Sequence, residues 1–349
     1  MSIIYFTLSI ILPLVLNLIF TPIIIGYAHK NSIFDATDHR KTHVGNIPRL
    51  GGIGFFLSSA ISLVIITRIT KSYSLFPFYI ATTMIFISGL RDDFKPIPAK
   101  VKLIVQILAA TILILKGYTL SHIYIPFFNI NLSLGYLKYP ITYIWVIGVT
   151  NAINLLDGMD GQAGGVSALA SLTMGIVGLI TGHIEIATIC FILTGALIGF
   201  LRFNLPPAKI FMGDCGSLTI GFFLSAIPLL FTESDLKGKV ILVAIAVLLI
   251  PILDVFAAMI RRSRKKISFF APDRGHIHHK FIDFTSLNTK QILLVIYSIC
   301  IASGVMAIVF VVKTNIFTVS LLFINLILHA LLFLFLHQRK IERSKNETE

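Results

Sequence analysis

The sequence predicts an all-α, polytopic integral membrane protein with about eleven transmembrane helices, ten being the alternative count. Of its 349 residues, 56% are hydrophobic and only 13% are charged. Apolar runs repeatedly approach the roughly 20 residues that a helix needs to cross a bilayer. The acidic, Asn-rich and His-rich clusters fall between these runs, which favours an enzyme at the membrane surface over a channel.

The apolar runs extend along the whole chain, so we expect a single domain, residues 1–349. The first run, Ile3 to Ile25, lacks a basic start and a small-residue cleavage site, so we expect a retained span and no signal peptide. The expected spans are residues 3–25, 51–69, 75–90, 101–119, 140–156, 163–182, 184–203, 216–231, 239–260, 291–312 and 315–336.

The basic residues predict how these spans are oriented. With an odd number of spans the termini lie on opposite faces, and 22 of the 29 lysines and arginines then fall on the face that holds the C-terminus, with 7 on the other. The positive-inside rule makes that face cytoplasmic. The net charge of +13 therefore reflects topology, and no nucleic-acid partner is expected. The cytoplasmic segments, in which the active site is predicted, are loops 26–50, 91–100, 157–162, 204–215 and 261–290, with a tail at 337–349.

The longest loop on the other face, residues 120–139, has an alternating apolar pattern from Ile123 to Leu132 that predicts a short β-hairpin. The three cysteines have no metal-binding or redox spacing, so no disulfide framework is expected.

Two adjacent carboxylates, Asp92 and Asp93, close the third expected span. Because they repel each other at a membrane boundary, they indicate a divalent cation, a basic substrate group or a raised pKa. An isolated pair of this kind would more often be a charged loop cap. Lys100, taken alone, is typical of a membrane-surface anchor.

The segment from Asn151 to Gly161 is more specific. Asn151, Asn154 and Asp157 recur every three residues and so share a helix face, and Asn154 and Asp157 offer oxygen ligands suited to Mg²⁺. A plain helix-ending turn would not need two amides inside an apolar span, where unpaired amides are costly. We therefore predict a functional site here.

Residues 204–217 lead into the eighth expected span. Asp214 lies at a glycine-flanked helix start, where it could bind a cation whose phosphates also meet the helix N–H groups. Taken alone, an N-cap is the simpler interpretation of Asp214.

The longest expected cytoplasmic loop begins with a basic run at 261–266, which indicates topology or anionic lipid. Further along, His276, His278 and His279 follow Arg274, a combination that suits phosphate binding. Zinc is disfavoured because no cysteine or fourth histidine has a structural-site spacing.

Taken together, these loops resemble the polyprenyl-phosphate N-acetylhexosamine-1-phosphate transferases of glycosyltransferase family 4, which include the MraY, WecA and TagO enzymes. Five motifs in the same order, from about Lys41 to His279, carry the resemblance. The segments 48–52 and 272–279 are similar to the WecA and TagO branch. The first loop departs from MraY, because His43 to Pro48 contains no lysine close before the proline.

The resemblance implies transfer of a sugar-1-phosphate, expected from UDP-N-acetylglucosamine, to undecaprenyl phosphate, with release of UMP and a need for Mg²⁺ or Mn²⁺. It implies that Asp92 or Asp93 deprotonates or positions the lipid phosphate, and that Asp214 and Asn154 hold the metal. The other residues that it assigns are catalytic Asp157, Asp160 and His279, and substrate-binding Lys100, Asn151, Asn204, Phe211, Arg274, His276 and His278.

Charge neutralisation by a cation and flanking basic groups is what a reaction between two phosphate anions needs. The resemblance further implies a multi-pass protein of the cytoplasmic membrane, surrounded by membrane lipids, that starts a cell-envelope glycan such as lipopolysaccharide or teichoic acid. A homodimer is left open.

Three alternatives remain. The nearest is phospho-N-acetylmuramoyl-pentapeptide transfer, or transfer from another UDP-N-acetylhexosamine. A CDP-alcohol phosphatidyltransferase has an Asp-Gly-x-x-Ala-Arg core that the segment 157–163 resembles superficially, but Gly164 stands where that core has arginine. A transporter would need ionisable residues inside the membrane, for which Glu185 and Asp254 are the candidates.

Overall fold

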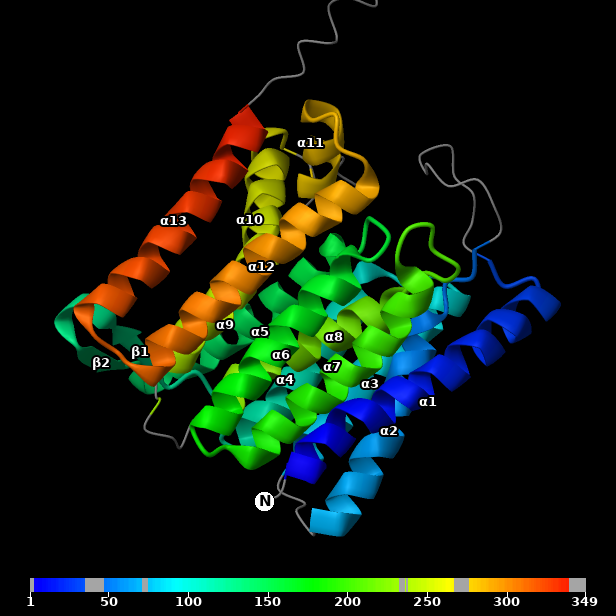
Figure 1. Ribbon diagram of the computed structural model, residues 1–349, viewed down its shortest axis with the longest axis horizontal. Coiled ribbons are helices and arrows are strands. Elements are labelled where there is room, and N and C mark those ends of the chain that lie inside the picture. Colours follow the sequence, from blue (N-terminus) through cyan, green and yellow to red (C-terminus); the bar gives the residue numbers. More distant parts are fainter. Residues whose placement is uncertain are drawn as a thin grey trace, which may run out of the picture.

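The computed structural model describes residues 3–34, 47–70, 75–231, 236, 238–266 and 276–338. These residues form a bundle of α-helices with a small two-stranded sheet at one end (Figure 1). The helices are α1 (Ile3–Lys30), α2 (Gly51–Thr70), α3 (Phe76–Phe94), α4 (Ala99–Leu115), α5 (Lys138–Leu156), α6 (Gln162–Ile180), α7 (Ile184–Asn204), α8 (Asp214–Leu230), α9 (Lys239–Val247), α10 (Leu249–Arg264), α11 (Ile277–Phe284), α12 (Thr289–Val312) and α13 (Ile316–Gln338).

Each expected span coincides with a helix whose bounds differ by a few residues, except the ninth. Residues 239–260 form two helices, α9 and α10, that are bent by 75°. A continuous helix would need an N–H group on Pro251 to reach the carbonyl of Val247, and proline has none. The chain therefore starts a new helix at Leu249, with Pro251 in its first turn.

By length and composition, seven of the described helices could cross a membrane, or eight if the bent pair is one span. The expected count of about eleven exceeds this number because some helices fall short of a full span. α3 ends with Arg91, Asp92 and Asp93, and α4 and α8 have 17 residues each, against the roughly 20 that a full crossing takes. The chain is a polytopic all-α membrane protein.

The helices differ in how deeply they lie within the bundle. Of the most apolar part of α7, 78% is buried, and of α6 72%, whereas α1 and α13 are each only 22% buried. Since α1 and α13 are apolar nearly all round, their exposed side chains suit a lipid environment. The core therefore centres on α6, α7 and α8 (Figure 1).

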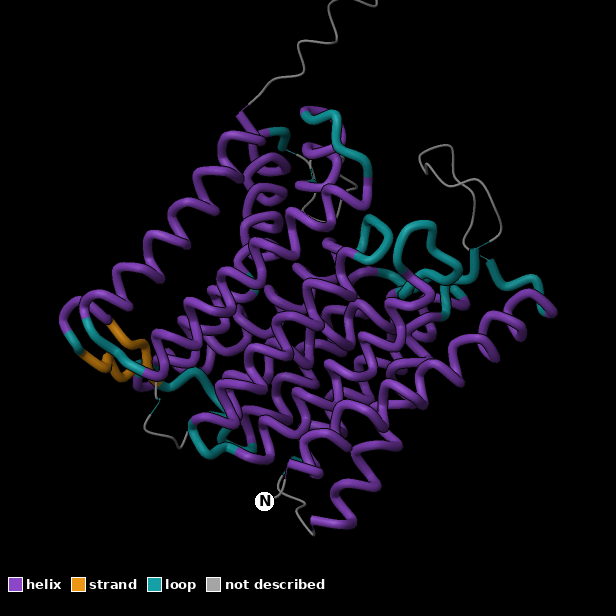
Figure 2. The backbone as a smooth tube through the Cα atoms, in the orientation of Figure 1, coloured by secondary structure: helices purple, strands orange, loops and turns teal. Residues whose placement is uncertain are grey.

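The loops that carry the candidate residues gather at one end of the bundle, which we call the loop end (Figure 2). It holds loops 157–161 and 205–213, residues 47–50 and α11. The opposite, hairpin end holds β1 (His122–Ile125) and β2 (Ile130–Ser133), which pair antiparallel with His122 opposite Ser133. The expected hairpin is thus confirmed.

Candidate active site

The start of α8 is positioned by the segment that leads into α2. The N–H of Gly51 donates to the carbonyl of Phe211 over 2.9 Å, and that of Gly52 to the carbonyl of Met212 over 2.8 Å. In return, the N–H of Phe211 donates to the carbonyl of Pro48 over 2.8 Å. The two motifs thus form one backbone-paired unit, which places Arg49 beside α8.

Glycines let the backbones approach closely at this point. Gly213 has φ +75°, and a Cβ there would lie 2.6 Å from a carboxylate oxygen of Asp93. On α3, a Cβ at Gly89 would lie 2.6 Å from the carbonyl oxygen of Asp214. Only glycine fits both positions without displacing its neighbours.

Asp93 holds α3 against the N-terminus of α8. Its side chain is fully buried, and its carboxylate accepts hydrogen bonds from the N–H groups of Asp214 (2.8 Å) and Cys215 (2.9 Å). Burial raises the pKa of Asp93 to about 6, although the hydrogen bonds from Cys215 and the charge of Arg49, 3.6 Å away, lower it. Asp93 thus satisfies two of the N–H groups that a helix start leaves without partners.

Asp92 has different partners. Its carboxylate accepts a hydrogen bond from the N–H of Ile97 over 2.9 Å and lies 3.1 Å from Nζ of Lys102. The expected Lys100 is exposed, so Lys102, which the sequence analysis missed, is the lysine of the cluster. A lysine inside the apolar run 101–119 was the available signal.

Asp214 joins both cations of the site. Its carboxylate accepts hydrogen bonds from Nη2 of Arg49 (2.6 Å) and from Nζ of Lys102 (2.8 Å). Burial acts to raise the pKa of Asp214, but Arg49 and Lys102 outweigh it and hold this pKa below its usual value. The side chain of Arg49 is 40% exposed, so the cluster opens toward the loop end. We call Asp92, Asp93, Asp214, Arg49 and Lys102 the acidic cluster.

The two amides of α5 contact different helices. Nδ2 of Asn154 donates to Oγ of Ser217, in the first turn of α8, over 2.8 Å. Nδ2 of Asn151 donates to Oε1 of Gln106 on α4, also over 2.8 Å. Asn154 therefore lies beside the start of α8, whereas Asn151 links α5 to α4.

Asp157 ends α5 and is partly buried. Burial raises its pKa to about 7, with a smaller contribution from the charges of Asp214, Asp93 and Asp160, while Arg49 lowers it. Asp157 is therefore electrostatically coupled to the acidic cluster.

Asp160 and Asn204 tie two loops together. Oδ2 of Asp160 accepts a hydrogen bond from the N–H of Ala208 over 3.0 Å. The buried Asn204 accepts one from the N–H of Gly161 over 3.0 Å and donates to the carbonyl of Ile210 over 2.9 Å. Both side chains thus brace loop 157–161 against loop 205–213.

The histidine motif is linked to α10. Nδ1 of His276 lies 2.8 Å from Oδ2 of Asp254, whose other oxygen accepts the N–H of Ile277 over 2.9 Å. Both His276 and Asp254 are buried. Asp254, named above as a transporter candidate, therefore caps α11, a helix not expected within loop 261–290. Arg274 and the side chains of His278 and His279 lie outside the described residues.

Within the described part of the chain, no three His, Cys, Asp or Glu side chains converge as a metal cage. Mg²⁺ usually needs only one or two carboxylates, with water and substrate phosphates as further ligands. The oxygens of Asp214 and Asn154 meet that need near the start of α8. The donor set therefore fits a Mg²⁺ ion that arrives with a phosphate ligand.

Comparison with known proteins agrees with these motifs. Residues 75–232 match the family model described as glycosyl transferase family 4. A Bacillus subtilis (strain 168) protein described as a probable undecaprenyl-phosphate N-acetylglucosaminyl 1-phosphate transferase is 33% identical over 319 residues, covering 91% of this chain and 88% of the relative. The undecaprenyl-phosphate alpha-N-acetylglucosaminyl 1-phosphate transferase of Escherichia coli (strain K12) is 30% identical over 311 residues, covering 86% and 84%.

A phospho-N-acetylmuramoyl-pentapeptide-transferase of Clostridium botulinum (strain Eklund 17B / Type B) is 33% identical over 235 residues, covering 64% of this chain and 72% of the relative. From its loop motifs and these relatives, the chain belongs to glycosyl transferase family 4, the polyprenyl-phosphate N-acetylhexosamine-1-phosphate transferases.

Proposed function

We propose that this protein transfers N-acetylglucosamine-1-phosphate from UDP-N-acetylglucosamine to undecaprenyl phosphate, releasing UMP, at the cytoplasmic face of the cell membrane. The observation that supports this most is the acidic cluster, which holds three carboxylates and two cations at one end of a membrane-spanning bundle. The Bacillus subtilis relative described as a probable N-acetylglucosaminyl transferase aligns with 91% of this chain, against 64% and 81% for two pentapeptide transferases.

The reaction joins two anions. An oxygen of the lipid phosphate attacks the sugar-bearing phosphorus of the UDP-sugar, the bond to the UMP oxygen breaks, and UMP leaves. Arg49 and Lys102 would neutralise phosphate charge, because guanidinium and ammonium groups bind phosphate oxygens strongly. Their contacts with Asp214 keep both cations at the start of α8.

Asp157 is the residue best matched to accept a proton from the lipid phosphate, because a pKa of about 7 lies near the operating pH. Asp93 and Asp92 would act by positioning, since Asp93 holds the start of α8 and Asp92 orients Lys102. This assigns separate roles to two carboxylates that the sequence treats as a pair.

Asp214 and Asn154 would hold Mg²⁺, which when bound neutralises charge on the diphosphate. A carboxylate has about four acceptor sites, so Asp214 could ligate the ion and still contact Arg49 and Lys102. Asn154 keeps its Oδ1 for this purpose, since its hydrogen bond to Ser217 uses Nδ2.

The test is UMP release by the purified protein, given UDP-N-acetylglucosamine, undecaprenyl phosphate and Mg²⁺. Release should need all three, stop with a chelator and fall to background in Asp214→Ala. Full chelator-resistant turnover, or normal turnover of folded Asp214→Ala, would contradict the proposal.

The orientation in the membrane can be tested separately with a Lys100→Cys variant, because the native cysteines are buried. An impermeant thiol reagent should label Lys100→Cys in open membranes and not in intact cells.

A further inference from the structure

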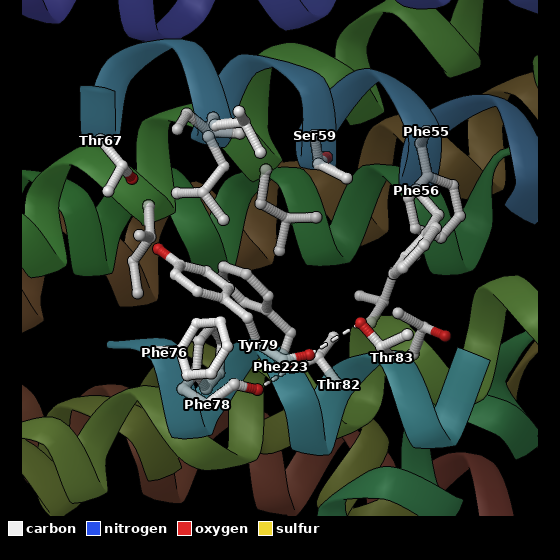
Figure 3. Close-up of a pocket in the computed structure, with 18 of the residues that line it drawn as sticks. Phe55, Phe56, Ser59, Thr67, Phe76, Phe78, Tyr79, Thr82, Thr83 and Phe223 are labelled. Carbon is white, nitrogen blue, oxygen red and sulfur yellow. Dashed lines mark hydrogen bonds between the residues drawn. The ribbon is translucent and has the colours of Figure 1, made fainter. Parts of the chain in front are cut away.

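A hollow of about 410 Å³ lies between α2 and α3, with side chains of α7 and α8 behind it (Figure 3). Phenylalanines 55, 56, 76, 78 and 223 supply much of its wall. The hydroxyls of Thr82 and Thr83 donate to carbonyls within α3, whereas the buried hydroxyl of Ser59 has no hydrogen-bond partner. The volume falls within the range of about 300 to 1,000 Å³ that is usual for ligand sites.

The hollow runs along the membrane-crossing direction. On α2 it extends from Phe55, near the loop end, to Arg68, near the hairpin end. At 1.5 Å per residue this stretch of helix is roughly 20 Å long, and the hydrocarbon core of a bilayer is about 30 Å thick. A hydrocarbon chain aligned with the bilayer lipids therefore fits its direction and length.

Direct packing closes the hollow toward the acidic cluster. Phe56 of α2 and Phe86 of α3 stack face to face, with ring centroids 3.8 Å apart. One turn further on, Gly89 of α3 lies against the backbone of Asp214. A lipid whose phosphate reacted at the acidic cluster would have to cross this packing, so the hollow does not suit the chain of the acceptor lipid.

The opposite rim carries a cation. Arg68 is exposed and is the one charged side chain among the described residues that line the hollow. A lipid chain gains little by leaving the bilayer for an equally apolar wall, so retention must come from the headgroup. Guanidinium binds phosphate through paired hydrogen bonds.

We propose that this hollow is a phospholipid site: an acyl chain fills the space between α2 and α3, and the lipid phosphate binds Arg68 at the hairpin end. The chain would supply the packing contacts that an empty apolar hollow lacks. The lipid would thereby hold α2 and α3 together on the outside of α8, away from the acidic cluster.

The test measures lipid bound to the purified full-length protein, by mass spectrometry of the intact complex and of extracted lipid. Wild type should retain stoichiometric phospholipid after detergent exchange. Ala60→Phe, which fills the hollow, and Arg68→Gln, which removes the cation, should each reduce it to background. The matched controls are Ala330→Phe, at a partly exposed alanine of α13, and Lys116→Gln, at an exposed lysine that does not line the hollow; both should retain the lipid.

Phospholipid retention that is equal in all five proteins would overturn the assignment. The assignment would also be overturned if the protein retained polyprenyl phosphate and Ala60→Phe abolished that retention, since the hollow would then bind the acceptor lipid. If Ala60→Phe does not fold, the phospholipid retained by Arg68→Gln is compared with that retained by Lys116→Gln, and equal retention overturns the assignment. No substrate is added, so the result is independent of the proposed transferase activity.

Discussion

The bracing role of Asn204 leads to a prediction that separates stability from substrate binding. Asn204→Ala removes the hydrogen bonds to Gly161 and Ile210 and leaves a buried N–H and a buried carbonyl without their partners. Each such loss costs about 1 to 3 kcal/mol. For the two losses together we expect the free energy of unfolding to fall by about 2 to 6 kcal/mol, and the melting temperature to fall by about 3 to 8 °C.

Asn204→Asp extends the test, because one carboxylate oxygen can still accept from Gly161 while the other faces the carbonyl of Ile210. When ionised, that second oxygen repels the carbonyl; when protonated, it can donate to it. Burial should raise the pKa of the new carboxyl, so its stabilising bond is present at low pH and is lost as the pH rises. The variant should be closer to wild type at pH 5 than at pH 8.

The assay is thermal unfolding of the detergent-solubilised protein without substrate, followed by the KM for UDP-N-acetylglucosamine. Asn31→Ala is the control, because Asn31 donates an exposed 2.8 Å hydrogen bond to Tyr27, and its loss should cost under about 0.5 kcal/mol. A raised KM with an unchanged melting temperature in Asn204→Ala would refute the bracing role and support direct substrate contact.

Three further predictions concern the charged groups of the loop end. Lys102→Gln removes a cation from the acidic cluster and should lower kcat/KM at least about tenfold, or about 1.4 kcal/mol. The control Lys100→Gln, at an exposed lysine, should change kcat/KM less than about twofold. Equal effects of the two variants would contradict the role of Lys102. The pKa of Asp157, raised from 3.8 to about 7, predicts that stability declines as the pH rises from about 4 to about 7, by at most about 4 kcal/mol. In unfolding scans, Asp157→Asn should flatten this decline of stability with pH. An unchanged dependence on pH would show that Asp157 does not cause the decline. Asp254→Asn can still accept a hydrogen bond at His276 and should therefore retain more turnover than Asp254→Ala. Equal turnover of the two variants would argue that Asp254 does not position His276.

Most helices could be predicted because a helix that faces lipid is apolar nearly all round, a property visible without knowledge of its neighbours. The 75° bend was missed because residues 239–260 are apolar throughout, so hydropathy alone gives one span. Pro251 was the available signal for that bend. α11 was missed because its first turn depends on Asp254, which lies 23 residues from the N–H that it accepts.

The sequence indicates some of the residues that the structure brings together in the acidic cluster. Asp92, Asp93 and Asp214 stand out in the sequence because carboxylates are costly near a membrane. Adjacent residues on a helix point about 100° apart, so Asp92 and Asp93 must face different neighbours, but the sequence does not say which. In the sequence, Lys102 looks like a lysine that anchors a helix at the membrane surface. Only the folded structure shows that it lies 2.8 Å from Asp214, which is 112 residues away.

The most direct test of the central claim is a comparison of two donors in one UMP-release assay with Mg²⁺ and undecaprenyl phosphate. The proposed activity predicts turnover with UDP-N-acetylglucosamine and none with UDP-N-acetylmuramoyl-pentapeptide. Turnover with the pentapeptide donor alone would contradict the proposed substrate, and folded protein that is inactive with both would contradict the proposed reaction.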